Sequence, residues 1–148
     1  MARAPLQINV IPYRKRENGF LEFAEFHCSD GTMWHFVSGG AEDGESASVA
    51  AKRELIEETG ITSTNNWMTL DSRASIPKDA YPHITHWPKE VLVLPQFSFG
   101  IDSSGQEIVL SDEHDDFRWL SFNEVTKLLK WDSDKVALWE LNERLKSQ

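Results

Sequence analysis

Three carboxylate side chains, Glu54, Glu57 and Glu58, lie close together in a segment whose composition favours a helix. At about 100° per residue they share an arc of roughly 100° on one helical face. Like charges this close destabilise a helix, and a position near the C-terminal end sets them against the helix dipole. A bound divalent cation would reverse that cost, because carboxylate oxygens suit Mg²⁺ or Mn²⁺. A solvated acidic face is the alternative, and Arg53 would offset part of the repulsion in either case.

The segment around these carboxylates predicts how they are positioned. Residues 45–59 are rich in Ala and Glu, and Gly60 follows where a helix C-cap glycine belongs. Residues 38–44 contain three glycines and are expected to form a loop before the helix. Ala47 and Ala50 fall on the carboxylate side of the helix, where small side chains would leave room for a ligand to approach.

Residues 39–61 match the Nudix signature G-x5-E-x7-R-E-U-x-E-E-x-G-U, in which U is a bulky aliphatic residue. All of its specified positions are filled, by Gly39, Glu45, Arg53, Glu54, Leu55, Glu57, Glu58, Gly60 and Ile61. The chain therefore resembles the Nudix hydrolases. The resemblance implies an α+β fold, the Nudix α/β/α sandwich with a mixed sheet, as a single domain over residues 1–148.

The resemblance also implies a role for each polar residue of the signature. Glu57 and Glu58 correspond to the main ligands of the Mg²⁺ or Mn²⁺ cofactor, and Glu54 to a further ligand or to the base that activates water. The carbonyl group of Gly39 would be a backbone ligand. Arg53 would orient the carboxylates through charge-assisted hydrogen bonds.

Other signature residues would support this arrangement. Glu45 is expected to pair with Arg53 or to brace the loop, and Leu55 and Ile61 to pack under the helix. Many Nudix enzymes supply another glutamate from a later loop, as a metal ligand or as the base. Glu113, within residues 110–120 (LSDEHDDFRWL), is the candidate here. An exposed acidic turn is the alternative for this segment.

The remaining pattern mixes strands and helices. Alternating and apolar segments predict strands at 5–13, 20–28, 33–37, within 61–74, at 90–101 and around 117–120, with a long loop at 75–89. Pro95 implies an edge or a bulge in its strand. Ser121 and Glu124 form a capping box before a helix to about residue 130, and Ser133 or Asp134 is expected to cap a last helix to about residue 145.

The implied reaction is hydrolysis of a diphosphate bond in a nucleotide-like molecule. Residues 111–145 are similar to the tail of bacterial dATP pyrophosphohydrolases and dihydroneopterin triphosphate pyrophosphatase. On that basis the substrate is a nucleoside or pterin triphosphate, cleaved to the monophosphate and pyrophosphate. Trp34 and Trp87 are candidates to stack on its ring, although we favour a core position for Trp34.

Other functions remain open at this point. Within the family, the substrate could be a dinucleoside polyphosphate or ADP-ribose. A non-catalytic nucleotide sensor is a further alternative, although a sensor has no need to keep every catalytic glutamate. An isomerase on the same fold would need a catalytic cysteine, and Cys28 lies well before the signature in a predicted strand.

Composition narrows the partners. The formal net charge of −9 makes duplex nucleic acid an unfavourable partner. No apolar stretch approaches the roughly 20 residues needed to span a bilayer, and no signal peptide is recognisable, so we expect no membrane partner. With Cys28 as the single cysteine, the chain fits a reducing compartment, and we expect a cytoplasmic protein. The sequence leaves the oligomeric state open.

Overall fold

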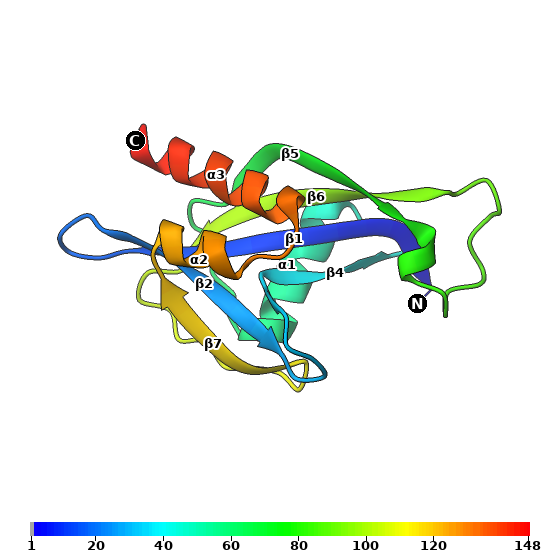
Figure 1. The fold of residues 1–148 in the computed structure, drawn as a ribbon, viewed down its shortest axis with the longest axis horizontal. Coiled ribbons are helices and arrows are strands. Elements are labelled where there is room, and N and C mark those ends of the chain that lie inside the picture. The colour runs from blue at the N-terminus through cyan, green and yellow to red at the C-terminus, as the bar shows by residue number, and fades with distance from the viewer. Residues whose placement is uncertain (1) are drawn as a thin grey trace.

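Helices cover both faces of a mixed sheet in the computed structural model, which describes residues 2–148 (Figure 1). Helix α1 (Ala47–Thr59) lies on one face, and α2 (Phe122–Leu128) and α3 (Asp132–Lys146) lie on the other. This arrangement confirms the predicted α/β/α sandwich. No helix in the described chain is long and apolar enough to cross a membrane.

The sheet is built around the long first strand. The strands are β1 (Arg3–Lys15), β2 (Leu21–Cys28), β3 (Trp34–His35), β4 (Val37–Glu42), β5 (Met68–Pro77), β6 (Val93–Asp102) and β7 (His114–Leu120), and a short 3₁₀ turn, η1 (Lys78–Ala80), follows β5. Their order is β3-β2-β1-β6-β5, with β4 paired to β1 and β7 to β2. The β1–β6 pair is parallel and the other pairs are antiparallel.

Alternation along β1 distributes its side chains between two cores. Ile8 and Val10 are buried on the α1 side, whereas Ile11 and Tyr13 pack with α2 and α3. On the α3 side, the next side chain toward the start of β1 is that of Asn9, where this face becomes polar. The sheet therefore has an apolar half under α3 and a polar half beyond the N-terminus of that helix.

The glycine-containing segment before α1 is a strand, so the predicted loop at 38–44 is wrong in its first part. Strand β4 pairs with β1, with Gly39 opposite Ile8 and Gly40 opposite Gln7. Backbone pairing decides this, because hydrogen bonds to β1 hold the segment extended whatever its local turn propensity. The turn itself comes later, at Gly44, whose φ is +85°.

Other boundaries also shift. Helix α1 begins at Ala47 after the N-cap Ser46, Gly60 ends it with φ of 75°, and the Ser121–Glu124 capping box is confirmed. Helix α3 begins at Asp132 without a side-chain cap, so the predicted caps at Ser133 and Asp134 are wrong. The expected edge or bulge at Pro95 is wrong, because β6 lies between β1 and β5 and its pairing is regular there; the proline is tolerated because the β1–β6 pairing starts one residue later, at Gln96.

Candidate active site

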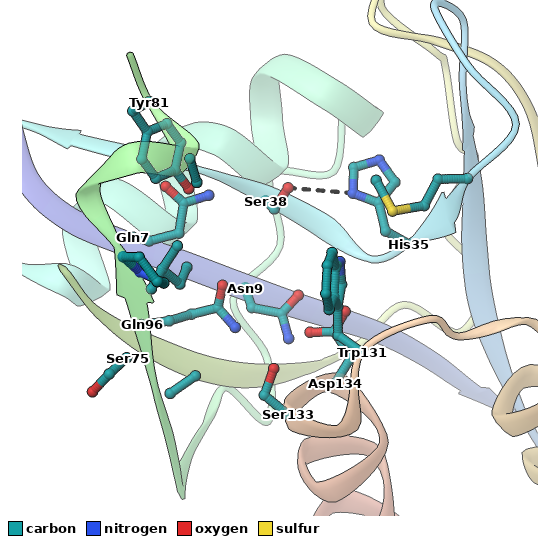
Figure 2. A pocket seen from close by; sticks show the side chains of 15 residues that line it. Gln7, Asn9, His35, Ser38, Ser75, Tyr81, Gln96, Trp131, Ser133 and Asp134 are labelled. Carbon is teal, nitrogen blue, oxygen red and sulfur yellow. Dashed lines mark hydrogen bonds between the residues drawn. The ribbon is translucent and has the colours of Figure 1, made fainter. Parts of the chain in front are cut away.

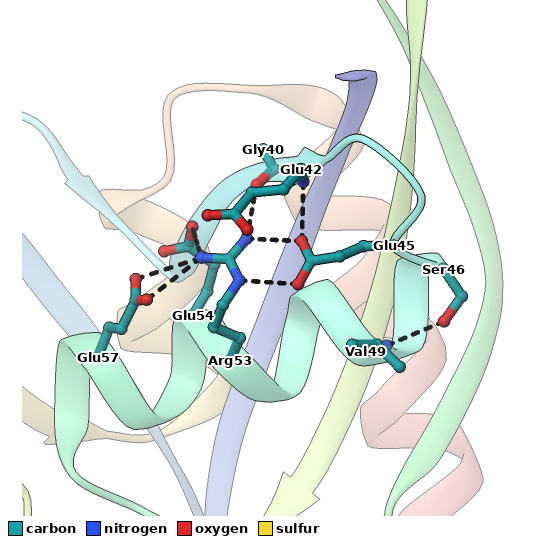
Figure 3. Close-up of polar contacts among 8 residues, drawn as sticks. All are labelled: Gly40, Glu42, Glu45, Ser46, Val49, Arg53, Glu54 and Glu57. Atoms are coloured by element: carbon teal, nitrogen blue, oxygen red, sulfur yellow. Dashed lines mark hydrogen bonds and ion pairs between the residues drawn. The ribbon is translucent and has the colours of Figure 1, made fainter. Parts of the chain in front are cut away.

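Arg53 is the centre of a polar network between α1 and β4 (Figure 3). Its guanidinium group donates two hydrogen bonds of 2.9 Å to Glu45 and one of 3.1 Å to the carbonyl oxygen of Gly40. The remaining Nη1 donates to Glu54 at 3.2 Å and to both oxygens of Glu57 at 3.3 Å. The predicted pairing with Glu45 is present, and the same guanidinium group contacts Glu54 and Glu57. Arg53 thus ties two α1 carboxylates to the strand before the helix.

Side chains from elsewhere occupy the space beside the two glycines of β4. A Cβ atom at position 39 would overlap the Glu54 carboxyl group, and one at position 40 would overlap the guanidinium group of Arg3. The close approach at Gly39 brings its backbone next to a candidate ligand. Leu55 and Ile61 pack in the core beneath this segment, and each is 1% exposed, as predicted. Ala50 is fully buried in that core, so the expected room for a ligand beside it is absent.

Glu58 is buried among other carboxyl groups. Its side chain is 1% exposed, and neither carboxyl oxygen has a hydrogen-bond partner within residues 2–148. Burial, contact with the Glu54 carboxyl group and the charge of Glu113 together raise the pKa of Glu58 to about 10. A buried carboxyl group with no partner needs a proton or a cation to neutralise it.

Glu113 lies immediately before β7 and close to the α1 carboxylates. Burial and the charges of Glu54 and Glu57 raise its pKa, which places all these groups in one electrostatic cluster. Its backbone carbonyl accepts a hydrogen bond from the N–H group of Ser29 at 3.1 Å, which fixes the segment against the end of β2. The structure therefore brings the candidate from the later segment to the signature helix.

The donor set fits a hard divalent cation, because every candidate ligand is an oxygen atom. With the side chains as placed, residues 2–148 contain no group of three His, Cys, Asp or Glu residues arranged to hold a metal ion. Arg53 contacts both Glu54 and Glu57 in this arrangement. Metal binding here would require Glu54 and Glu57 to give up these contacts with Arg53.

One histidine, His114, lies beside Glu58, and a second, His35, lies beside His114. Nε2 of His114 lies 3.8 Å from Glu58 Oε1 and 2.9 Å from Nε2 of His35, which in turn lies 3.1 Å from Sγ of Cys28. Burial lowers the pKa of His114, and burial with the neighbouring His114 lowers that of His35 to about 4. Both rings are therefore uncharged at neutral pH. Cys28 is in strand β2, as predicted.

A cavity of about 610 Å³ lies on the α3 side of the sheet, beyond the N-terminus of that helix (Figure 2). It is lined by Gln7, Asn9, Met33, His35, Ser38, Ala74, Ser75, Ile76, Pro77, Ala80, Tyr81, Gln96, Trp131, Ser133 and Asp134. Sequence reasoning missed it, although polar residues at alternate positions of apolar strands, Gln7 with Asn9 and Gln96 with Ser98, were a signal.

The two tryptophans proposed for stacking are not among these lining residues. Trp34 is half-buried outside both cores, with its ring 5.0 Å from that of His27, so the core position favoured for it is wrong. Trp87 is held by its Nε1–H group, which donates to the carbonyl oxygen of Arg3 at 2.7 Å. Trp131, at the start of α3, is the tryptophan that faces the cavity (Figure 2).

The sandwich fold, the carboxylate helix bound to β4 through an arginine, and the adjoining cavity define a Nudix-type domain. The sequence matches the NUDIX domain family over residues 5–139, and the chain belongs to this family.

Individual relatives agree with this assignment. A Listeria monocytogenes protein assigned to the NUDIX hydrolases has a solved structure that is 41% identical, with a TM-score of 0.85, over 97% of this chain and 96% of that one. The RNA pyrophosphohydrolase of Caulobacter vibrioides is 35% identical over 106 residues, which cover 65% of this chain; the chain spans 60% of the length of that relative. The Escherichia coli dihydroneopterin triphosphate pyrophosphohydrolase shares the fold, with 22% identity and a TM-score of 0.73 over 96% of this chain and 99% of that one.

Proposed function

We propose that this protein is a divalent-metal-dependent pyrophosphohydrolase that cleaves a nucleoside or pterin triphosphate to the monophosphate and pyrophosphate. The observation that carries the proposal is Glu58, a buried carboxyl group without a partner beside Glu54 and Glu113. Such a cluster is unfavourable by itself and favourable with a cation. The family relationship and the relative named as a pyrophosphohydrolase support the reaction class.

In this proposal Glu57, Glu58 and Glu54 hold Mg²⁺ or Mn²⁺ together with the carbonyl oxygen of Gly39. When bound, the cation neutralises the diphosphate, lowers the pKa of a bound water and stabilises the leaving group. Arg53 would hold the helix against β4 through Glu45 and the carbonyl oxygen of Gly40, and its contacts with Glu54 and Glu57 would give way when these carboxylates bind the cation.

The bond changes balance around one water molecule. Its oxygen forms a bond to phosphorus, the bridging P–O bond breaks, and pyrophosphate leaves with the electron pair of that bond. The proton of the water passes to a carboxylate, either Glu113 or Glu54. In this proposal Glu113 is the base, because Glu54 lies against Gly39, a further candidate ligand, and is assigned as a metal ligand.

The cavity supports a substrate that carries a ring. Its volume of about 610 Å³ lies in the range of small-molecule sites. Ser38 lines the cavity, and the next residue, Gly39, contacts Glu54. A triphosphate chain could therefore run from a ring in the cavity past β4 to the carboxylates. A dinucleoside polyphosphate or ADP-ribose would use the same path, so the products decide between them.

The test is a product assay with purified protein, Mg²⁺ and a panel of deoxynucleoside triphosphates, dihydroneopterin triphosphate, diadenosine tetraphosphate and ADP-ribose. We expect pyrophosphate and a monophosphate from a triphosphate, and loss of at least ~100-fold in kcat for Glu57→Gln. Glu17→Gln, an exposed glutamate in the β1–β2 turn, is the matched control. Release of ribose 5-phosphate and AMP as the main products, or full activity of Glu57→Gln, would contradict the proposal.

A further inference from the structure

The cavity beside β4 has the polarity of a site for a ring and not for a phosphate chain. Of the residues described, those that line it include no lysine or arginine. Instead, three amide side chains line it from the sheet, Gln7 and Asn9 on β1 and Gln96 on β6 (Figure 2). Each is at most 8% exposed, and part of their hydrogen-bonding capacity is used by Arg3, Ser98 and Asp134. The donors and acceptors that these contacts leave over can bind a polar edge of a ligand.

One carboxyl group meets these amides from the opposite side. Asp134 lies in the first turn of α3 and is 8% exposed, yet it lines the cavity (Figure 2). The positive end of the helix dipole favours a negative charge at this position. Burial raises the pKa of Asp134 to about 6, with the Gln96 amide acting against the rise. The group is therefore mainly ionised at neutral pH and can only accept hydrogen bonds.

The amides nearest Asp134 also offer acceptors. Nδ2 of Asn9 donates to the hydroxyl oxygen of Ser98 at 3.4 Å, which leaves its carbonyl oxygen for a ligand. The amide group of Gln96 favours the ionised form of Asp134, as a donor would. On the far side, the oxygen of Gln7 accepts from Arg3, so its NH₂ group remains as a donor. The Asp134 side of the cavity is thus rich in acceptors.

An aromatic face completes the site. Trp131 precedes Asp134 by one helical turn and lines the cavity with its indole ring, yet it is 53% exposed. A large exposed aromatic ring at the mouth of a polar cavity provides a surface on which a flat heterocycle can stack. Tyr81 lines the same cavity from the segment after η1.

We infer that the cavity selects a 2-amino-oxo heterocycle, the guanine or pterin type, whose adjacent ring N–H and amino groups both donate to the Asp134 carboxylate while Trp131 stacks on the ring. The carboxylate matches two parallel donors, as in other bidentate pairs. Adenine presents an acceptor beside its amino group and would place a lone pair against the negative charge. The inference rests on the proposed function, and it narrows the substrate class to exclude dATP as the preferred one.

The test compares substrates that differ at this edge. We expect kcat/KM for dGTP to exceed that for dITP, which lacks the 2-amino group, and that for dATP, each by about 10- to 100-fold. In Asp134→Asn the dGTP-to-dITP ratio should fall to within about 3-fold of one, while dATP hydrolysis is retained or improved. Asp132→Asn, an exposed aspartate in the same turn, is the matched control and should keep the wild-type ratios. The ratio between dihydroneopterin triphosphate and dGTP in the wild type distinguishes the two ring sources.

Measurements of nucleotide binding test the cavity assignment independently of the proposed hydrolysis. Calorimetric titration with dGMP, dIMP and dAMP requires no hydrolysis, and retained binding of dAMP by Asp134→Asn shows that the variant is folded. A wild type that binds dGMP but hydrolyses no triphosphate would support the cavity assignment and overturn the proposed reaction. Hydrolysis of triphosphates with dGTP, dITP and dATP within about 3-fold of one another would overturn the cavity assignment and keep the reaction. An unchanged ratio in Asp134→Asn would overturn the role of Asp134.

Discussion

Gly39 of β4 lies against the carboxyl group of Glu54 on α1, with no space between them for a Cβ atom. The pairing of Gly39 with Ile8 of β1 anchors one side of this contact in the sheet. The helix on the other side is fixed by the Arg53 fork to Glu45. The backbone of β4 and the Glu54 carboxyl group can therefore meet directly because position 39 has no side chain.

Replacing Gly39 with alanine should push Glu54 out of place. We expect a loss of about 1–3 kcal/mol in stability and a fall of at least ~10-fold in kcat with the best triphosphate. Thermal denaturation and steady-state kinetics measure both effects. Gly31→Ala is the control, because a Cβ at position 31 meets nothing within 4 Å. Wild-type kinetics for Gly39→Ala would show that the contact has no role in the site.

Replacing Glu58 with glutamine should have opposite effects with and without metal. In metal-free protein the change removes a buried carboxyl group that has no partner, so we expect stability that is equal or higher. With millimolar Mg²⁺ the wild type should gain stability by binding the ion, and Glu58→Gln should gain little. Melting curves with EDTA and with Mg²⁺ give the result. The idea fails if both proteins gain equally from Mg²⁺.

Arg53→Lys keeps the positive charge but loses the two parallel hydrogen bonds that the guanidinium group donates to Glu45. Lysine cannot donate two parallel hydrogen bonds to Glu45 while also reaching the Gly40 carbonyl oxygen. We expect kcat to fall by ~10-fold or more, because Glu45 and β4 are no longer registered on the helix. Arg16→Lys, an exposed arginine paired with Glu22, serves as the control and should leave kinetics unchanged. Equal kinetics for the two variants would refute a positioning role for Arg53.

Glu113→Gln should lower kcat by ~100-fold or more with little change in KM, if Glu113 accepts the proton of the attacking water. Its neighbour Asp112 provides the comparison, since Asp112→Asn removes an exposed carboxylate from the same segment. A fall of kcat in Glu54→Gln, with Glu113→Gln fully active, would instead assign the base to Glu54.

Glu25 gives the fold a pH dependence that does not involve the metal site. The residue is fully buried on β2, neither oxygen has a partner among the described residues, and burial with the charge of Asp134 raises its pKa from 4.5 to about 8. An acid with a raised pKa in the folded state binds its proton more tightly when folded. The contribution of Glu25 to the free energy of unfolding is therefore fully present below about pH 4.5 and is lost as the pH rises toward about 8.

Glu25→Gln should remove that loss. Relative to the wild type, we expect the variant to gain roughly 2–4 kcal/mol of unfolding free energy between pH 5 and pH 8, measured by urea denaturation. Glu22→Gln should behave oppositely. Burial acts against the charge of Glu22, but hydrogen bonds from Arg16 and Arg14 outweigh it and lower its pKa, so this variant loses stability at neutral pH and not in acid. A Glu25→Gln difference that is constant with pH would contradict the assignment.

The sequence by itself determined the carboxylate helix. The spacing of Glu54, Glu57 and Glu58 within residues 39–61 is local, and helix geometry converts such spacing directly into a shared face. The Gly60 C-cap and the Ser121 capping box were predictable for the same reason, since each depends on a few neighbouring residues. The Nudix resemblance then implied the sandwich that the structure has.

Tertiary structure decided what depends on residues distant in sequence. Residues 38–42 are a strand because β1 supplies their hydrogen-bond partners, and Ala50 is buried because the sheet lies beneath it. The cavity joins Gln7, Gln96 and Asp134, which come from three elements spread over most of the chain. No local pattern encodes such a meeting, because it depends on strand order and on where α3 begins over the sheet. The candidate metal-binding carboxylates could therefore be predicted from one helix, whereas the cavity forms only when the chain folds.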